Sequence, residues 1–302
     1  MLTSPSSPGL VLYLSAAKDV HPDLSPRSLR NRLRYIALAL KHGRELTAYL
    51  RQPAQRALAR ELVARPELMG CIVWPYVHAH WSMMRRFEAL SQHYQAMESD
   101  MAALMVSSSG SLVLADLSKV SAGLRLVIDR APWFLREGSL VLSQFLHDER
   151  LMSLVFSFGW KDGERVAYVG SVQGAKAGSA LANYREIAKD LYGMRSRDFL
   201  IKAFQLLAHH LSVKRVLCVG EQVRHHRHAY FGRSKSDELH LNYDTVWQEH
   251  AGVRTADGLF QLDALPMVRR MEDIAAKNRS LYRRRYALMD QLSTDIAARV
   301  RP

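Results

Sequence analysis

The chain has 302 residues, a formal net charge of +13 and a pI near 9.9. Its length allows one large domain or two modest ones, and its hydrophobic content of 48% is ordinary for a protein with a sizeable buried core. No window reaches the roughly 18 apolar residues that a membrane-spanning helix needs, whereas the positive charge favours acidic partners such as nucleic acid, phospholipid or phosphate-bearing cofactors.

The N-terminal third is predicted to be helical. The apolar stretch at residues 9–17 has no Lys or Arg before it, which argues against a cleaved signal sequence. Ser25-Pro26 is a typical cap and first-turn pair for an amphipathic helix. Its apolar stripe is Leu29, Leu33, Ile36 and Leu40, with Arg30, Arg32 and Arg34 mostly off the stripe. Further helices are expected at residues 54–64 and 80–97, followed by a serine-rich turn or linker at residues 107–111.

Beyond the linker the apolar period changes from 3.6 to 2, which indicates strands. Alternating runs occur at residues 124–129, 140–142 and 152–158. Asp162-Gly163 is a strong two-residue hairpin signal, and residues 165–173 alternate again as the returning strand. The pattern predicts an antiparallel meander.

Two helices and a buried strand are expected after the meander. A Gly-rich turn at residues 174–178 leads into a helix that ends at Gly193, and Ser196 is expected to cap the next helix. The apolar run at residues 215–220 is typical of a strand covered on both faces, which would return beside the meander after a crossover. We therefore predict an α+β fold in which a helical region at residues 1–110 packs on a mixed sheet flanked by helices at residues 111–302. A short helix at 243–249, a strand at 259–262 and a terminal helix complete it.

The terminal segment, residues 277–286, is basic, contains two tyrosines and has no acid. Arg283, Arg284 and Arg285 are candidate ligands for phosphates or acidic headgroups. The same segment fits a packed helix with a solvated basic face, because Ile274, Leu281, Leu288, Leu292 and Ile296 recur near the helical period. We favour the packed helix.

A second basic segment follows the buried strand, at the edge of the sheet where open α/β folds often place ligand sites. It contains Arg224, Arg227 and His226, and it begins just after Glu221. Glu221 and His226 are candidate general bases, although a solvated loop is the more common outcome. The run His225-His226-x-His228 suggests a metal site, but two arginines and the lack of nearby carboxylates other than Glu221 lead us to expect none.

Several catalytic signatures are missing from the sequence. It has no phosphate-binding loop of the G-x-x-x-x-G-K-[ST] type, no G-x-G-x-x-G after a strand, no G-x-S-x-G elbow and no paired-cysteine zinc spacing. Cys71 and Cys218 lie in apolar surroundings, so we expect buried reduced thiols and a cytoplasmic protein, with peripheral attachment to the inner membrane left open.

The order of meander, turn, helix and buried strand resembles the core of GNAT-like acyltransferases, in which backbone amides hold the pyrophosphate of coenzyme A. The resemblance implies acyl-CoA or another acyl donor as a cofactor. The donor would lie on Gln173, Gly174, Lys176 and Gly178, assisted by Arg195 and Arg197. The turn here departs from that family's Q/R-x-x-G-x-G/A pattern.

Several motifs from about residue 70 onward resemble the VirK/YbjX family of Gram-negative bacterial proteins, a family of unknown biochemical function. The motifs are Trp74-Pro75-Tyr76, Arg136 to Leu140, Gly170 to Gly174, Gly193 to Arg197, Asn242-Tyr243-Asp244 with Trp247, and Lys277 to Leu292. Ser196 stands where the family has proline. The resemblance implies a virulence- or envelope-stress-associated protein linked to antimicrobial peptide resistance, and it supplies no reaction.

Three functional hypotheses follow. The first is an acyltransferase-like site acting on an amine or hydroxyl, in which Glu221 or His226 removes a proton. It requires an open, positively lined gap between the last meander strand and the strand that contains Cys218. The second is a non-catalytic basic protein that binds nucleic acid or anionic membrane lipid through the two basic segments. The third is a structural protein with another protein as its partner, and the oligomeric state is left open.

Overall fold

The structure is a computed structural model that describes residues 9–104, 106, 110–175, 180–232 and 241–300. The predicted serine-rich linker at residues 107–111 lies largely outside the described residues, as do Lys176 and Gly178.

The described strands form one eight-stranded mixed sheet in the order β1-β2-β3-β4-β5-β6-β8-β7. They are β1 (Ser111–Asp116), β2 (Leu124–Asp129), β3 (Leu140–Leu146), β4 (Glu149–Lys161), β5 (Glu164–Gly174), β6 (Arg215–Val219), β7 (Val253–Arg254) and β8 (Leu259–Asp263). Neighbouring strands are antiparallel except β5 and β6, which pair in parallel from Val166–Arg215 to Val169–Cys218. The predicted meander, the buried strand beside it and the mixed sheet are confirmed.

The β4–β5 hairpin is formed by the turn that the sequence predicted. Asp162 and Gly163 both have positive φ angles, 55° and 78°, which is the requirement of a two-residue turn that matches strand twist. Farther along the ladder, Val155 pairs with Ser171 whereas Phe156 pairs with Val169, so Gly170 is an extra residue in β5. This bulge bends β5 near its C-terminal end.

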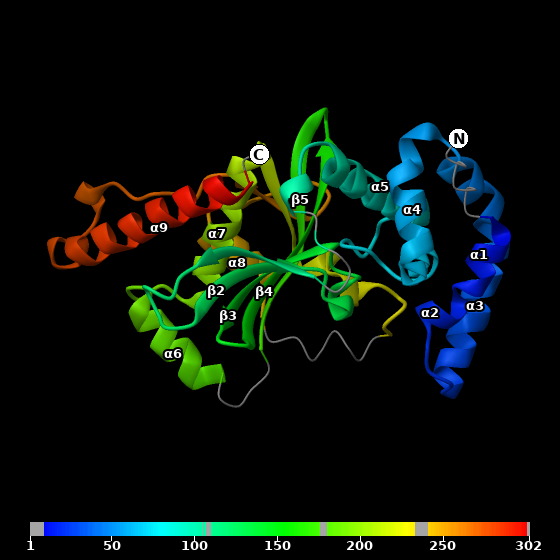
Figure 1. Ribbon diagram of the computed structural model, residues 1–302, viewed down its shortest axis with the longest axis horizontal. Helices are drawn as coiled ribbons and strands as arrows, with labels where there is room; N and C mark the ends of the chain where they lie inside the picture. Colours follow the sequence, from blue (N-terminus) through cyan, green and yellow to red (C-terminus); the bar gives the residue numbers. More distant parts are fainter. Residues whose placement is uncertain (1–8, 105, 107–109, 176–179, 233–240, 301–302) are drawn as a thin grey trace.

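The described helices are α1 (Leu10–Ser15), α2 (Ala17–Val20), α3 (Pro26–Leu50), α4 (Arg56–Ala64), α5 (Met83–Ser99), α6 (Ala180–Asp190), α7 (Ser196–His210), α8 (Tyr243–Glu249) and α9 (Arg279–Val300). In Figure 1, helices α6, α7 and α9 lie on the left side of the picture, and helices α1 to α5 lie on its right side. Phe156 of β4 packs against Phe204 of α7 with ring centroids 4.7 Å apart, and Phe158 stacks on His93 of α5. A single apolar cluster includes residues of α3, α5, the sheet, α7 and α9. The helical region therefore packs on the sheet, as predicted.

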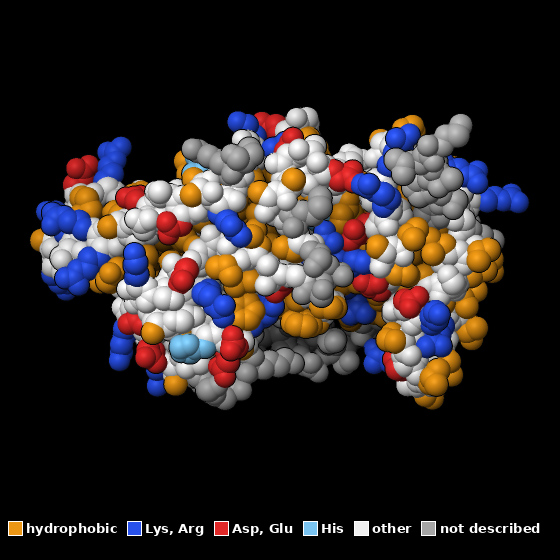
Figure 2. Space-filling model, in the orientation of Figure 1, with side chains coloured by type: hydrophobic (Ala, Val, Ile, Leu, Met, Phe, Trp, Pro, Cys, Tyr) orange, Lys and Arg blue, Asp and Glu red, His pale blue; other side chains and the backbone are white. Residues whose placement is uncertain are grey.

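Helix α3 forms where expected but buries a different face. Leu29, Leu33 and Leu40 are 45%, 69% and 55% exposed, whereas Tyr35 and Leu46 are fully buried. Amphipathic helices ordinarily bury their apolar stripe, and this one leaves most of it in solvent. Figure 2 shows hydrophobic side chains gathered along this end of the molecule.

Two finer expectations are corrected. Helix α7 begins at Ser196, but the Ser196 hydroxyl is buried and makes no capping bond within the described residues. Helix α9 begins at Arg279, so Ile274 lies before it, and Leu281 is 36% exposed. The buried stripe of α9 is Leu288, Leu292, Ile296 and Val300, which confirms a packed helix with a solvated basic face.

Candidate functional site

The parallel strands β5 and β6 separate after Val169 and Cys218, where the acyltransferase hypothesis requires an open gap. The space is filled by Tyr243 from the start of α8, which is 1% exposed. Its hydroxyl donates to the Val172 carbonyl and accepts from the Val172 N–H, both at 3.0 Å. The guanidinium of Arg224 lies 3.7 Å from the centroid of the Tyr243 ring. The strands part as predicted, but the expectation of an open gap is wrong.

Beside Tyr243 lies a buried polar cluster that contains Glu137, His225 and His226. Glu137 is 6% exposed, and its Oε1 lies 3.3 Å from Nε2 of His225. The Ser171 hydroxyl donates to Oε2 of Glu137, and Nε2 of Gln173 donates to the same oxygen at 2.6 Å. The two histidine rings are 3.7 Å apart between centroids. We call these five side chains the Glu137 cluster.

Burial raises the pKa of Glu137 to about 7, although the Ser171 hydroxyl and the charge of Arg224 oppose this shift. A carboxyl group with such a pKa exchanges protons at neutral pH, which is a property of general acids and bases. The cluster depends on a close approach of two backbones, because a Cβ on Gly170 would lie 1.8 Å from the carbonyl oxygen of Glu137. The bulge glycine thus permits Glu137 to reach β5.

Of the predicted donor-binding residues, the structure places Gln173 in the Glu137 cluster. Gly174 pairs with Met152 of β4, and a Cβ there would meet the Tyr184 hydroxyl at 2.6 Å. The next amide, of Ala175, already donates to the Leu151 carbonyl at 2.7 Å. These contacts occupy much of the backbone expected to hold a pyrophosphate.

Glu221, a predicted base, instead anchors the basic loop. Its carboxylate accepts from Arg224 at 3.1 Å, from Arg227 at 2.9 Å and from the backbone N–H of Tyr243 at 3.3 Å. The two arginines that we expected to attract an external anion are therefore paired within the protein. His226 remains a candidate base, and it is partly exposed.

Arg195 and Arg197 do not reach this site. Both donate to Glu249 at 2.7 Å, at the C-terminal end of α8, whereas Tyr243 at the other end of that helix contacts β5. Seven helical residues separate the two places by about 10 Å. Arg195 and Arg285 instead line a cavity of about 650 Å³ between α7 and α9. Arg283 and Arg284 are exposed on α9.

A basic groove of about 320 Å³ lies between α3 and residues 229–232. It is lined by Arg27, Arg30, Asn31, Arg34, Ala229, Tyr230, Phe231 and Gly232, with no acid among the described residues. Nearby, burial and then the charges of Arg86 and Arg34 lower the pKa of His228 to about 4. The positive charge of the groove comes from the three arginines that line it. The sequence showed the arginines of α3 but not that the loop after β6 lies against them.

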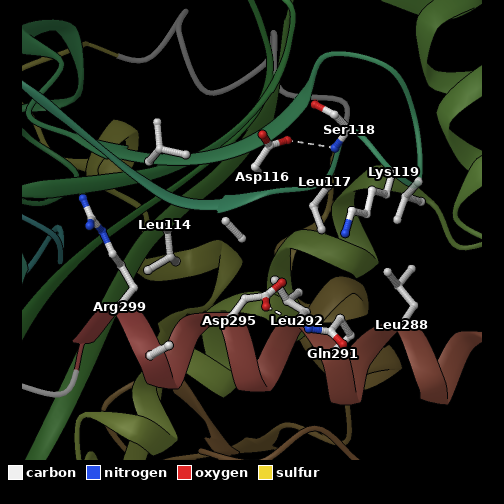
Figure 3. Close-up of a pocket in the computed structure, with 14 residues that line it drawn as sticks. Leu114, Asp116, Leu117, Ser118, Lys119, Leu288, Gln291, Leu292, Asp295 and Arg299 are labelled. Carbon is white, nitrogen blue, oxygen red and sulfur yellow. Dashed lines mark hydrogen bonds between the residues drawn. The ribbon is translucent and has the colours of Figure 1, made fainter.

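A larger groove of about 990 Å³ runs between β1 and α9 (Figure 3). Leu114 and Leu117 face Leu288 and Leu292 across it, with charged side chains such as Asp295 also lining it. None of the predicted site residues is among those that line it.

The fold and site together define an α+β protein with a mixed sheet, a buried carboxylate–histidine cluster where its parallel strands part, and a separate basic groove. Residues 25–298 match the family described as "Protein of unknown function (DUF535)", and the chain belongs to this family. It is 27% identical over 246 residues to the uncharacterized protein YbjX of Escherichia coli K12, covering 80% of this chain and 74% of that protein. The resemblance to the VirK/YbjX family is thereby confirmed.

An uncharacterized protein of Haemophilus influenzae is 31% identical over 128 residues, which is 42% of each chain. No solved structure matches the chain significantly. Within the described residues, no helix has both the length and the apolar character needed to cross a membrane.

Proposed function

We propose that the protein binds anionic membrane surfaces through α3. The observation that carries this proposal is the exposed leucine stripe of α3, which lies beside the arginines of the basic groove. Leu33 alone is 69% exposed, and Leu24 just before the helix is 74% exposed. Contiguous exposed apolar side chains on a helix mark interaction surfaces, and basic residues beside them favour an anionic lipid interface.

The helical geometry supports a dual contact with headgroups and acyl chains. At 3.6 residues per turn, Arg27, Arg30 and Arg34 lie roughly a third of a turn around α3 from Leu29 and Leu33. A helix lying in the interface places its apolar stripe among the acyl chains and its flanking cations among the phosphates. Each arginine near an anionic surface contributes about 1 kcal/mol to binding.

The groove gives this surface a place for a headgroup phosphate. Arg27, Arg30 and Arg34 all line the groove of about 320 Å³, together with Tyr230. Arginine matches phosphate geometry through bidentate hydrogen bonds, and tyrosine suits the membrane–water interface. A membrane-bound protein of this kind would fit the envelope-stress role that the family resemblance implies.

Vesicle flotation tests the proposal. We expect the chain to float with phosphatidylcholine vesicles that contain phosphatidylglycerol, more weakly at high salt, and not with phosphatidylcholine alone. The double variant Arg30→Gln/Arg34→Gln should lose binding, whereas Arg283→Gln/Arg284→Gln, which removes the same charge from α9, should retain it. Equal losses in both would show attraction to net charge and would refute a site on α3.

Nucleic acid is the competing anionic partner. A gel-shift assay with double- and single-stranded DNA at two salt concentrations, run on wild type and on Leu33→Gln, separates the two cases. Both kinds of binding weaken with salt, but binding to phosphates alone does not need the leucines of α3. Tight DNA binding that is insensitive to the leucines of α3 would contradict the membrane proposal.

A second candidate function is acyl transfer at the C-terminal end of β5. It is favoured by the separation of β5 from β6 and by the bulge at Gly170, since bulges recur beside active sites. Tyr243 must leave the gap for a donor to enter. Calorimetry with acetyl-CoA and a long-chain acyl-CoA tests this proposal. If neither compound gives heat of binding, acyl-CoA is excluded as the donor at this site.

A further inference from the structure

We infer that Glu137, His225 and His226 form a binding site for a divalent metal ion of the zinc class. One donor atom from each residue lies within 4.8 Å of the other two. Two imidazoles and one carboxylate are ligands suited to zinc and neighbouring transition metals, whereas magnesium and calcium prefer oxygen alone. Three protein ligands also leave a coordination position open, which is the arrangement of catalytic zinc sites.

The distances fit a tetrahedral ion. Ligands about 2.0 to 2.1 Å from zinc lie roughly 3.3 Å from one another at the tetrahedral angle. Nε2 of His225 and Oε1 of Glu137 are already 3.3 Å apart. The widest separation in the cluster, at most 4.8 Å, must close by no more than about 1.5 Å. Glu137 and His225 already have the required spacing, so this movement concerns His226, the partly exposed member of the three.

The Glu137 carboxylate is oriented in the way that is usual for a metal ligand, because its oxygen that faces away from His225 accepts hydrogen bonds from neighbouring side chains. Ser171 and Gln173 both donate to Oε2 of Glu137, which leaves Oε1 for the contact with Nε2 of His225. Outer partners of this kind orient a ligand and raise its affinity for the metal.

Two nearby arginines work against a dication, but both have other partners. Arg224 pairs with Glu221 at 3.1 Å and lies over the ring of Tyr243. Arg136 lies over Trp74 at 4.4 Å and over Tyr230 at 5.5 Å. Their charges lead us to expect weaker binding than in an all-thiolate structural zinc site.

Metal analysis of the untagged full-length protein tests the inference, independently of the membrane proposal. After equilibration with Zn²⁺ and removal of free metal, we expect about one zinc per chain. Co²⁺ should give the visible absorption of a tetrahedral ion. Glu137→Gln and His225→Asn should each abolish stoichiometric zinc, and Gln173→Met should lower the affinity about 10- to 100-fold as an outer partner. His80→Asn, at an exposed histidine outside the cluster, should bind as wild type does.

Circular dichroism and thermal melting of each variant without metal separate loss of the site from loss of the fold. Absence of zinc from the wild-type protein, or equal losses in His80→Asn and His225→Asn, would overturn the inference. Normal zinc binding with no vesicle binding would refute only the proposal for α3.

Discussion

Replacing Leu33 with glutamine tests the membrane surface at its most exposed apolar position. Full burial of a leucine side chain contributes about 1.5 to 3 kcal/mol. Because 69% of Leu33 is in solvent in the free protein, insertion into the interface should contribute about 1 to 2 kcal/mol. Leu33→Gln should therefore lower the partition coefficient onto anionic vesicles roughly 5- to 30-fold.

The measurement is a vesicle titration followed by sedimentation. A polar substitution at an exposed position usually changes folding stability by less than about 0.5 kcal/mol, so the melting temperature should be nearly unchanged. Val253→Gln is the matched control, because Val253 is also 69% exposed but lies on β7. The reasoning fails if Leu33→Gln binds like wild type, or if Val253→Gln loses as much.

Two further predictions concern stability. Burial, helped by the charge of Arg130, lowers the pKa of His93 from 6.5 to about 3, so the unfolded chain binds the extra proton and stability falls as the pH drops below about 6.5. Between about pH 7 and pH 5 the contribution of His93 amounts to about 2 kcal/mol. Urea titrations should therefore show a change in stability that is about 2 kcal/mol more unfavourable for wild type than for His93→Asn, since the other shifted groups titrate in both proteins. Equal changes in both would contradict this prediction. Tyr243→Phe leaves the N–H and C=O of Val172 without their hydroxyl partner, so urea unfolding should show a loss of about 1 to 3 kcal/mol. An unchanged midpoint would show that other groups replace the hydroxyl.

The sheet was largely predictable because its signals are local. Asp162-Gly163 has the two positive φ angles that its turn needs, and strict alternation defines the long strands on both sides. The buried run at β6 likewise follows from composition over a few residues. Strand β1 was missed, because it lies at the sheet edge and its burial pattern does not alternate regularly.

The Glu137 cluster was not predictable, because its members meet only through the topology of the sheet. Glu137 stands before β3 and His225 follows β6, so β4 and β5 lie between them in the sequence, whereas the fold brings the two side chains into contact. The sequence argument against a metal rested on the two neighbouring arginines and on the lack of a carboxylate near the histidines other than Glu221. The fold brings one to 3.3 Å. The motif Arg136-Glu137-Gly138 was visible, but nothing local gave it a role.

The sequence also did not predict which face of α3 is buried. Periodicity shows that leucines share a stripe, and it does not show which stripe finds a partner. Tyr35 is fully buried and donates to the Tyr13 carbonyl at 2.7 Å, so the contact with α1 turns the aromatic side inward and the leucines outward.

The basic groove and the Glu137 cluster share a wall, which leads to a last prediction. Phe231 lines the groove and lies 5.4 Å from the ring of His225 and 5.3 Å from that of His226. Arg136, next to Glu137 in sequence, lies over the Phe231 and Tyr230 rings. We predict that a headgroup that moves Phe231 also moves His225 and His226, the proposed metal ligands.

Linkage requires the effect to be reciprocal. If vesicles change zinc affinity by some factor, zinc must change vesicle affinity by the same factor, and coupling between sites is typically about 5- to 150-fold. Zinc titrations with and without phosphatidylglycerol vesicles, paired with vesicle titrations with and without zinc, measure both factors. Phe231→Ala should reduce the two factors together while leaving each ligand able to bind alone. Binding of both ligands with no mutual effect would show that the shared wall is rigid.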